Sequence, residues 1–274
     1  MMLSVIIPTC HRPAALSACL QRLQPGAQSL PASQYQVIVT DDSHNHETEI
    51  LVSQQFTWVH YTRGPQRGLA ANRNHGARQA KGEWLVFTDD DCLPDPGWLQ
   101  AYADAITQHP ECRAFEGAIL PDHWDLLKKD MAECPVNDKG GCFWSANIMV
   151  QKRLCWQVGG FDEQFKIPAQ EDQDLQNRLA VHGPIVFIRQ SIVTHPVRIA
   201  SFNRSVAKIP ASIKNWHSYY SKFHGPVATL LKGYKTQILA LRANLAKGKL
   251  KAALLNLITF FCLLPVVFSH RFIK

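Results

Sequence analysis

Three consecutive carboxylates, Asp89, Asp90 and Asp91, directly follow an apolar stretch of the sequence, residues 83–88 (EWLVFT). Adjacent carboxylates repel one another, and each loses hydration near a protein interior, so the arrangement costs free energy unless something compensates the charge. The compensating partner is a divalent cation, a cluster of arginines or solvent. Hard divalent cations such as Mg²⁺ prefer oxygen ligands of this kind, so a cation site is one prediction from the triplet.

Two further pairs of acids stand where elements are expected to meet. Asp41 and Asp42 follow another apolar stretch (VIVT). Asp and Ser favour turns, so an Asx turn is the simple structural explanation of this pair. Glu171 and Asp172 begin a helix-like stretch, where the helix dipole favours the ionised form that a general base requires. Good capping chemistry alone also explains acids in a first helical turn.

Short stretches rich in Val and Ile alternate with amphipathic stretches over the first 119 residues. This alternation predicts a mostly parallel sheet with helices on both faces, a Rossmann-like α/β sandwich. Ligands bind beyond the carboxyl ends of the strands in such sheets, which is where Asp41 and the acid triplet fall. The expected strands are residues 3–8, 35–40, 57–61 and 83–88. One expected helix begins at Pro13, and two more cover residues 68–82 and 97–109.

The character of the sequence changes twice after this region. Residues 119–141 have no clean period, which predicts a long loop with a short helix, and long loops in compact domains are often lids. Residues 142–150 and 171–182 are then a strand and a helix by their patterns. Past His195 the expected elements are helices without acids, so we divide the chain into a catalytic domain, residues 1–200, and a helical extension, residues 201–274.

Charge is distributed unevenly along the chain. Residues 1–174 hold all 22 Asp and Glu against 14 Lys and Arg, a net charge of −8, whereas residues 175–274 hold 15 Lys and Arg and no acid. A basic tail indicates an anionic partner, and the apolar residues that run through it favour a membrane surface over nucleic acid. Residues 252–268 are uncharged but only marginally long for a span, which needs about 17 to 25 apolar residues. We expect helices in the membrane interface; the alternatives are a true span, or a tail packed on its own domain or in a dimer.

The N-terminus and the cysteines indicate the compartment. The apolar run at residues 1–8 is short, lacks a basic region and stops at Pro8, so a first strand explains it better than a signal peptide. The eight cysteines contain no C-x-x-C pair, which predicts reduced thiols. We therefore expect a cytoplasmic protein, peripheral at the inner face of the cytoplasmic membrane.

Five motifs follow one another within the first 195 residues: VIIPTCHRP, VIVTDDS, GLAANRNHGARQAKGEWLVFTDDDCLPDPGWL, SANIMVQKRLCWQVGGFDEQF and QEDQDLQNRLAVHG. In order and approximate spacing they resemble the family 2 inverting glycosyltransferases with a GT-A fold. Beyond His195 no family pattern carries over. The resemblance implies a GT-A sandwich of the kind that the alternation of strands and helices also predicts.

The resemblance implies that the acid triplet is the D-x-D element, which binds a nucleotide-diphospho-sugar through a divalent cation, Mn²⁺ or Mg²⁺. Asp91 is then the strongest metal ligand, Asp89 a second ligand nearer the ribose, and Asp90 a nucleotide-binding residue. His195 resembles the histidine that completes the metal site in a number of family members. An ordinary structural histidine is the alternative.

The nucleotide site implied by the resemblance includes four further residues. Asp41 would accept a hydrogen bond from the base, which fits the imide N–H of uracil, with Asp42 second and Thr9 touching the same base. Arg73 would lie beside the nucleotide and pair with phosphate or with the acid triplet. A solvated helix arginine is one alternative for Arg73, and Arg67 and Arg63 are close enough in sequence to compete for the same role. The expected donor is a UDP-sugar.

The catalytic residues follow from the same resemblance. Asp172 stands in the position of the family's catalytic base, with Glu171 before it. Asn147 and Trp144 would border the acceptor sugar, although packing around a strand explains both equally well.

These features predict a metal-dependent inverting glycosyltransferase that moves a sugar to a hydroxyl of a saccharide or lipid-linked acceptor, in cell-envelope polysaccharide or lipopolysaccharide assembly. A nucleotidyltransferase on a similar fold is one alternative, but it would carry a glycine-rich loop that PTCHRPAAL lacks. A non-catalytic, membrane-associated module that binds a nucleotide-sugar is another. We expect no nucleic-acid partner, and the oligomeric state stays open.

Overall fold

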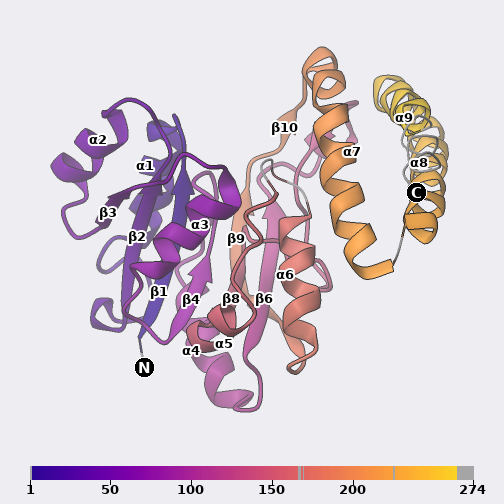
Figure 1. Cartoon of the computed structure of the whole chain (residues 1–274). Helices are drawn as coiled ribbons and strands as arrows, with labels where there is room; N and C mark the ends of the chain where they lie inside the picture. Colours follow the sequence, from indigo (N-terminus) through magenta and orange to yellow (C-terminus); the bar gives the residue numbers. More distant parts are fainter. Residues whose placement is uncertain (1, 166–167, 169, 225, 264–274) are drawn as a thin grey trace. The chain divides into compact units, whose positions relative to one another are not determined.

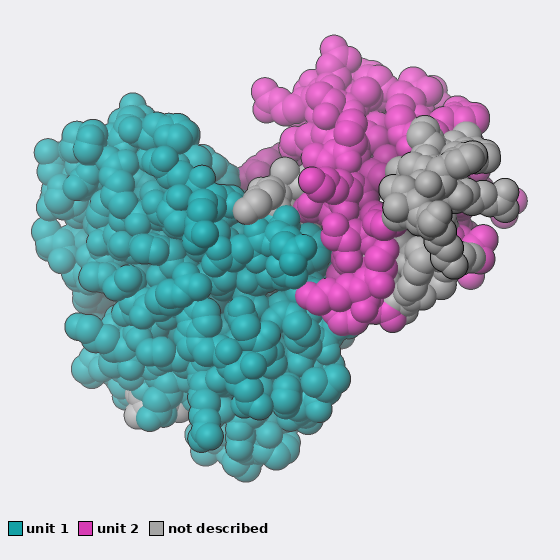
Figure 2. Space-filling model, in the orientation of Figure 1, with its two compact units in different colours: residues 1–122, 135–196 teal, residues 123–134, 197–274 magenta. Residues whose placement is uncertain are grey.

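The computed structural model describes residues 2–165, 168, 170–224 and 226–263. The chain divides into two compact units, coloured separately in Figure 2. Unit 1 consists of residues 1–122 and 135–196, and unit 2 of residues 123–134 and 197–274. One boundary thus falls close to residue 200, but the segment 123–134 belongs with the C-terminal helices, which the sequence does not indicate.

Unit 1 is built on an eight-stranded sheet in the order β3-β2-β1-β4-β8-β6-β9-β5. Parallel pairing joins β1 to β2 and β4, β2 to β3, and β6 to β9, whereas β8 and β5 run antiparallel to their neighbours. The mostly parallel sheet confirms the expected α/β fold class. Its strands are β1 (Leu3–Thr9), β2 (Tyr35–Asp41), β3 (His60–Arg63), β4 (Trp84–Phe87), β5 (Leu93–Pro94), β6 (Ala114–Pro121), β8 (Ile148–Gln151) and β9 (Ile185–His195).

Helices cover both faces of the sheet, so its strands are buried on both sides (Figure 1). Successive strand residues point to opposite faces. Val5 and Ile7 therefore pack in one core cluster with α1, α2 and α4, while Ile6 packs in the other with α3, α5 and α6. The helices are α1 (Pro13–Leu23), α2 (Glu47–Gln55), α3 (Leu69–Arg78), α4 (Trp98–Gln108), α5 (Lys152–Gln157) and α6 (Glu171–Ala180), with a 3-10 turn at Ala32–Gln34.

Local sequence determines how α3 approaches the sheet. The helix follows Gly68, whose φ of 99° favours glycine. Gly76, in the last turn of α3, lies so close to the strands that a Cβ there would come within 2.9 Å of Ile6 Cγ2 and Thr40 Cγ2. This close approach brings Arg73, one turn earlier on α3, to the edge of the sheet where the acids lie.

The structure differs from the sequence-based expectation in the middle of the chain. Of the strand expected at residues 142–150 only β8 forms, because the backbone N–H groups of Cys142 and Phe143 donate to the buried carboxylate of Glu116 and not to a strand. β6 also continues to Pro121, inside the segment expected to be a loop.

The described residues of unit 2 form three helices and a two-stranded sheet. They are α7 (Phe202–His224), α8 (Pro226–Ala246), α9 (Leu250–Cys262), the strands β7 (Ala132–Glu133) and β10 (Arg198–Ile199), and the 3-10 turn Leu126–Lys128.

Contacts within unit 2 explain why the segment 123–134 belongs to it. The Asp130 carboxylate accepts hydrogen bonds from the backbone N–H groups of Lys251 and Ala252, 2.7 and 3.1 Å away, at the start of α9. Lys249 Nζ donates to the Leu127 carbonyl at 2.7 Å. No helix within the described ranges is long and apolar enough to cross a membrane. Residues 264–268 of the expected uncharged stretch lie outside the described residues.

Candidate active site

Two arginines meet the acid triplet at the carboxyl end of β4. Arg12 bridges two of the acids, with Nη1 2.6 Å from Asp90 Oδ1 and Nη2 2.5 Å from Asp91 Oδ2. Arg73 Nη2 lies 2.9 Å from Asp89 Oδ1. Asp90 and Asp91 are buried, so these contacts supply much of the compensating charge that the sequence calls for.

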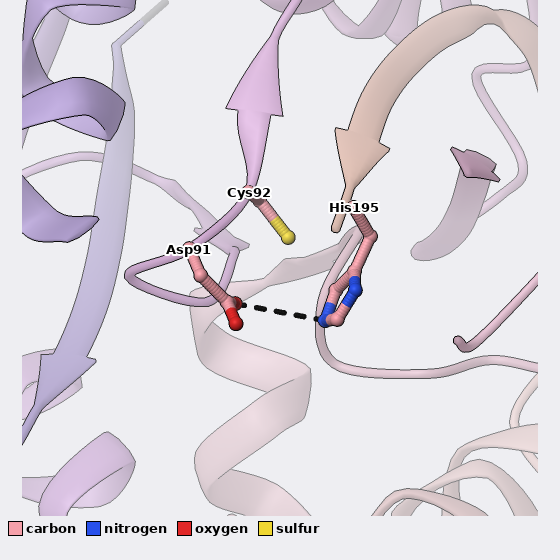
Figure 3. Close-up of side chains that lie close together, drawn as sticks. All are labelled: Asp91, Cys92 and His195. Atoms are coloured by element: carbon pink, nitrogen blue, oxygen red, sulfur yellow. Dashed lines mark ion pairs between the residues drawn. The ribbon is translucent and has the colours of Figure 1, made fainter. Parts of the chain in front are cut away.

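His195 approaches the same carboxylate from the end of β9. Its Nε2 lies 3.6 Å from Asp91 Oδ1, and Figure 3 shows the two side chains facing each other beside Cys92. The other ring nitrogen, Nδ1, is 2.9 Å from the Pro196 carbonyl, which only accepts, so Nδ1 carries the proton. Burial lowers the pKa of His195, which favours the neutral ring with its Nε2 lone pair directed at Asp91.

This arrangement fits a divalent cation. A carboxylate oxygen and an imidazole lone pair that face each other at 3.6 Å repel unless positive charge lies between them. A ligating histidine characteristically donates its second ring N–H to a carbonyl, as His195 does. Cys92 is a poor ligand, because burial raises the pKa of its thiol and its Sγ is directed at the Ala146 carbonyl, 3.9 Å away. The oxygen and nitrogen donors suit Mn²⁺ or Mg²⁺.

Arg73 links the acid triplet to the start of α6. Its guanidinium is buried, and Nη1 lies 3.0 Å from Glu171 Oε1 while Nη2 contacts Asp89. The expected pairing of Arg73 with the triplet is thus present in the structure. Glu171 is committed to this ion pair, so it is the weaker candidate for a proton acceptor.

Asp172 has the properties of a general base. Its Oδ2 accepts a hydrogen bond from the Ser145 N–H at 3.1 Å, and its buried Oδ1 finds no hydrogen-bond partner among the described residues. Burial and the neighbouring Glu171 charge raise the pKa of Asp172 to about 7, although Arg73 and Ser145 act in the opposite direction. The expected stabilisation of the ionised form by the helix N-terminus is therefore outweighed by desolvation.

The acids at the end of β2 lie in a separate hydrogen-bonded cluster. Asp41 is fully buried; it accepts from Ser43 through Oδ1 and from the Tyr61 hydroxyl through Oδ2, at 2.5 and 3.1 Å. Asp42 is half-buried and accepts from the Gln66 N–H at 2.9 Å. Thr9 joins this end of the sheet to the triplet, because its hydroxyl donates to Asp90 Oδ2 at 2.7 Å.

The two residues expected at the acceptor differ in their surroundings. Asn147 is buried, and its amide makes four hydrogen bonds within the core, two from the side chains of Trp98 and Tyr102 and two to the carbonyls of Ala118 and Ser191. No position on this amide remains for an acceptor sugar, so Asn147 does not lie with the site. The alternative explanation, packing around a strand, describes its environment.

Trp144 lies in the loop before β8 and is half-buried beside Ser145, whose N–H contacts Asp172. It remains the acceptor-side candidate.

Sequence reasoning missed Arg12, whose signal was its position three residues after the end of β1. Parallel neighbours in a sheet end at the same edge, so a residue just beyond β1 reaches the acids just beyond β4.

Comparison with known proteins bears on this site. The model of the family "Glycosyl transferase family 2" matches residues 4–143, just over half of the 274 residues. A validoxylamine A glucosyltransferase from Streptomyces hygroscopicus subsp. jinggangensis is 27% identical over 230 residues, which cover 69% of this chain and 54% of the relative. The chain spans about half the length of that relative.

Solved structures share the fold at low sequence identity, and two of them hold a nucleotide or nucleotide-sugar. One is residues 1–349 of S. aureus TarS in complex with UDP, with a TM-score of 0.59, 16% identity and coverage of 100% of this chain and 93% of that one. The other is the mannosyltransferase PcManGT from Pyrobaculum calidifontis with GDP-Man and Mn²⁺, with a TM-score of 0.59, 16% identity and coverage of 94% and 84%.

Proposed function

This chain belongs to glycosyl transferase family 2, and on that premise we propose that it transfers a sugar from a nucleotide-diphospho-sugar to a hydroxyl group of an acceptor, with inversion at the anomeric carbon. The observation that carries the proposal is the buried Arg73 bridge between Asp89 and Glu171. It brings the donor-binding triplet and the candidate base into one site, which neither a binding module nor a structural role requires.

Asp172 is the residue we assign to proton transfer. The acceptor hydroxyl gives its proton to the Asp172 carboxylate while its oxygen bonds to the anomeric carbon and the bond from that carbon to the diphosphate breaks. The Ser145 N–H donates to Oδ2 of this carboxylate, and Arg73 Nη1 lies 3.9 Å from its Oδ1. A general base contributes about 10² to 10⁴ in rate.

Asp91 and His195 would hold the divalent cation, with Asp89 nearby. A bound cation would stabilise the negative charge that develops on the departing diphosphate. Mn²⁺ in the PcManGT structure supports this assignment. Thr9, Asp41 and Asp42 form the base end of the site in our proposal, and UDP is the favoured nucleotide because TarS binds it and because a carboxylate suits an imide N–H.

The acceptor is a saccharide or a lipid-linked saccharide at an anionic membrane surface. Unit 2 supports this proposal, because residues 197–274 hold 13 Lys and Arg and no acid, and because α8 and α9 expose large apolar side chains. These include Leu239, Leu250, Leu254 and Phe261, exposed by 54%, 68%, 48% and 56%. Basic and exposed apolar side chains on the same helices are typical of interfacial binding, in keeping with a role in envelope polysaccharide assembly.

Calorimetry with UDP, GDP and dTDP, with and without Mn²⁺, tests the donor assignment. We expect UDP to bind most tightly and to require Mn²⁺. Release of UDP from UDP-sugars then reports the chemistry without knowledge of the acceptor. Asp172→Asn should bind UDP as the wild type does and lose about 10²-fold or more of the release rate. Nucleotide binding without turnover of any donor by the wild type would instead favour the non-catalytic module.

A further inference from the structure

Arg12 and Arg73 both neutralise the acid triplet, but the two side chains differ in how deeply they are buried. The Arg73 side chain is 2% exposed and is held between Asp89 and Glu171. The Arg12 side chain is 38% exposed and lies on the connection between β1 and α1, where its backbone φ of −136° and ψ of 49° are not helical. Arg73 is thus enclosed by the core, whereas more than a third of the Arg12 side chain is exposed to solvent.

Arg12 contacts Asp91, the carboxylate that the cation would use, and also the neighbouring Asp90. Its two Nη atoms bind one oxygen each of Asp90 and Asp91, whose side chains are only 4% and 6% exposed. The second oxygen of Asp91 faces His195 Nε2. A guanidinium and a divalent cation on one carboxylate repel each other strongly in a poorly solvated site.

Within the proposed reaction, the negative charge of the donor can relieve this repulsion between Arg12 and the cation. A nucleotide diphosphate brings several negative charges to the same place, and a planar guanidinium is well suited to phosphate oxygens. Before the donor binds, Asp90 and Asp91 still need a counter-charge, because buried carboxylates without one are costly.

We propose that Arg12 is an exchangeable counter-ion: it neutralises Asp90 and Asp91 until cation and donor arrive together, and it then moves from Asp91 to the donor's diphosphate. The inference rests on the proposed function. Its consequence is that the cation binds poorly without nucleotide, since it must displace Arg12 unaided. Binding of cation and nucleotide is therefore coupled, and the coupling is reciprocal.

The test is a binding cycle for Mn²⁺ and UDP on the full chain. Electron paramagnetic resonance of free Mn²⁺ gives the affinity for the metal alone and with saturating UDP, and the ratio of the two is the coupling factor. We expect wild-type coupling in the usual range of about 5- to 150-fold. In Arg12→Gln, Mn²⁺ alone should bind more tightly, UDP more weakly, and the coupling factor should fall toward one.

Two variants serve as controls. Arg22→Gln removes an exposed arginine of α1 and should leave the affinities for Mn²⁺ and for UDP, each measured with and without the other, unchanged. Arg12→Lys retains the charge and should restore most of the wild-type coupling. Unchanged coupling in Arg12→Gln, or weaker binding of Mn²⁺ alone, would overturn the role of Arg12 while leaving the proposed function intact. A wild type that binds neither UDP nor Mn²⁺ would instead overturn the proposed function, and this inference with it.

Discussion

At the scale of single residues, the environment of Asp172 predicts the pH dependence of the reaction. Burial and Glu171 raise the pKa of this carboxyl to about 7, and only its ionised form accepts a proton. The rate of donor turnover should therefore rise with pH through about 7 and level off above it. A profile of kcat/KM between pH 5.5 and 9 checks this; a rate that is constant across the range would exclude Asp172 as the base.

The same shift predicts that Asp172 lowers the stability of the folded protein. Because the folded-state pKa lies above the ordinary value of 3.8, the ionised carboxylate is disfavoured by folding, and the cost grows as pH rises from about 4 to above 7. Asp172→Asn removes this cost, so it should be about 0.5 to 2 kcal/mol more stable at pH 8, as substitutions at strained functional sites often are. Thermal melts at pH 8 and pH 5 measure it, and the gain should shrink at pH 5.

His195 is the residue whose loss tests the cation site most directly. His195→Ala removes the imidazole that faces Asp91, and it should weaken Mn²⁺-dependent binding of UDP by about 10- to 100-fold, since even indirect partners of a metal contribute that much. His60→Ala, an exposed histidine on β3, is the matched control. Equal UDP affinity in the two variants would make His195 an ordinary structural residue.

At the scale of elements, Glu116 on β6 holds the loop that leads to the base. Its buried carboxylate accepts from the backbone N–H groups of Gly141, Cys142 and Phe143, and the Ser145 N–H that follows contacts Asp172. In Glu116→Gln one of the two oxygens becomes an NH₂ group, which then faces a backbone N–H group, so two hydrogen-bond donors meet. Glu116→Gln should therefore destabilise unit 1 by about 1 to 3 kcal/mol.

Chemical denaturation of Glu116→Gln measures that loss. Glu111→Gln, at an exposed acid on the connection from α4 to β6, is the control and should lie within about 0.5 kcal/mol of the wild type. The Glu116 variant should also turn over donor more slowly with unchanged UDP affinity, because the loop positions Asp172 and not the nucleotide. A variant that loses UDP affinity but keeps its rate of donor turnover would contradict this role of the loop.

The elements that the sequence predicts are those whose patterns are local. β1, β2 and β4 have continuous apolar runs, and α1 and α4 have clear helical periods, so the acids that follow the strands could be placed at one edge of the sheet. The late start of β8 could not be predicted, because the carboxylate that binds the backbone before it, that of Glu116, lies 26 residues from Cys142 along the chain. Asn147 was misplaced for the same reason: its core partners lie 29 to 49 residues away along the chain.

At the scale of the whole molecule, acidic and basic residues are distributed unevenly between the two units. All the acids of the candidate site lie in unit 1, while residues 197–274 are purely basic. Unit 2 also contains Asp125, Asp130 and Glu133; of these, Asp125 pairs with Lys128 and Asp130 caps α9, so these two serve local structure. In keeping with the proposed membrane partner, we expect the positive charge of residues 197–274 to attract an anionic surface.

The nature of that partner can be decided by salt and by substitution. An anionic bilayer attracts each nearby Lys or Arg by about 1 kcal/mol and also takes up the exposed apolar side chains of α9, whereas nucleic acid uses the charge alone. Leu254→Ser with Phe261→Ser should therefore weaken co-sedimentation with phosphatidylglycerol vesicles by about tenfold or more, since burying such a side chain is worth about 1.5 to 3 kcal/mol. Ile50→Ser, at a 52% exposed residue of α2, is the control and should bind as the wild type does. Equal vesicle binding by the α9 variant, together with binding to DNA that disappears at high salt, would replace the membrane by nucleic acid as the partner of unit 2.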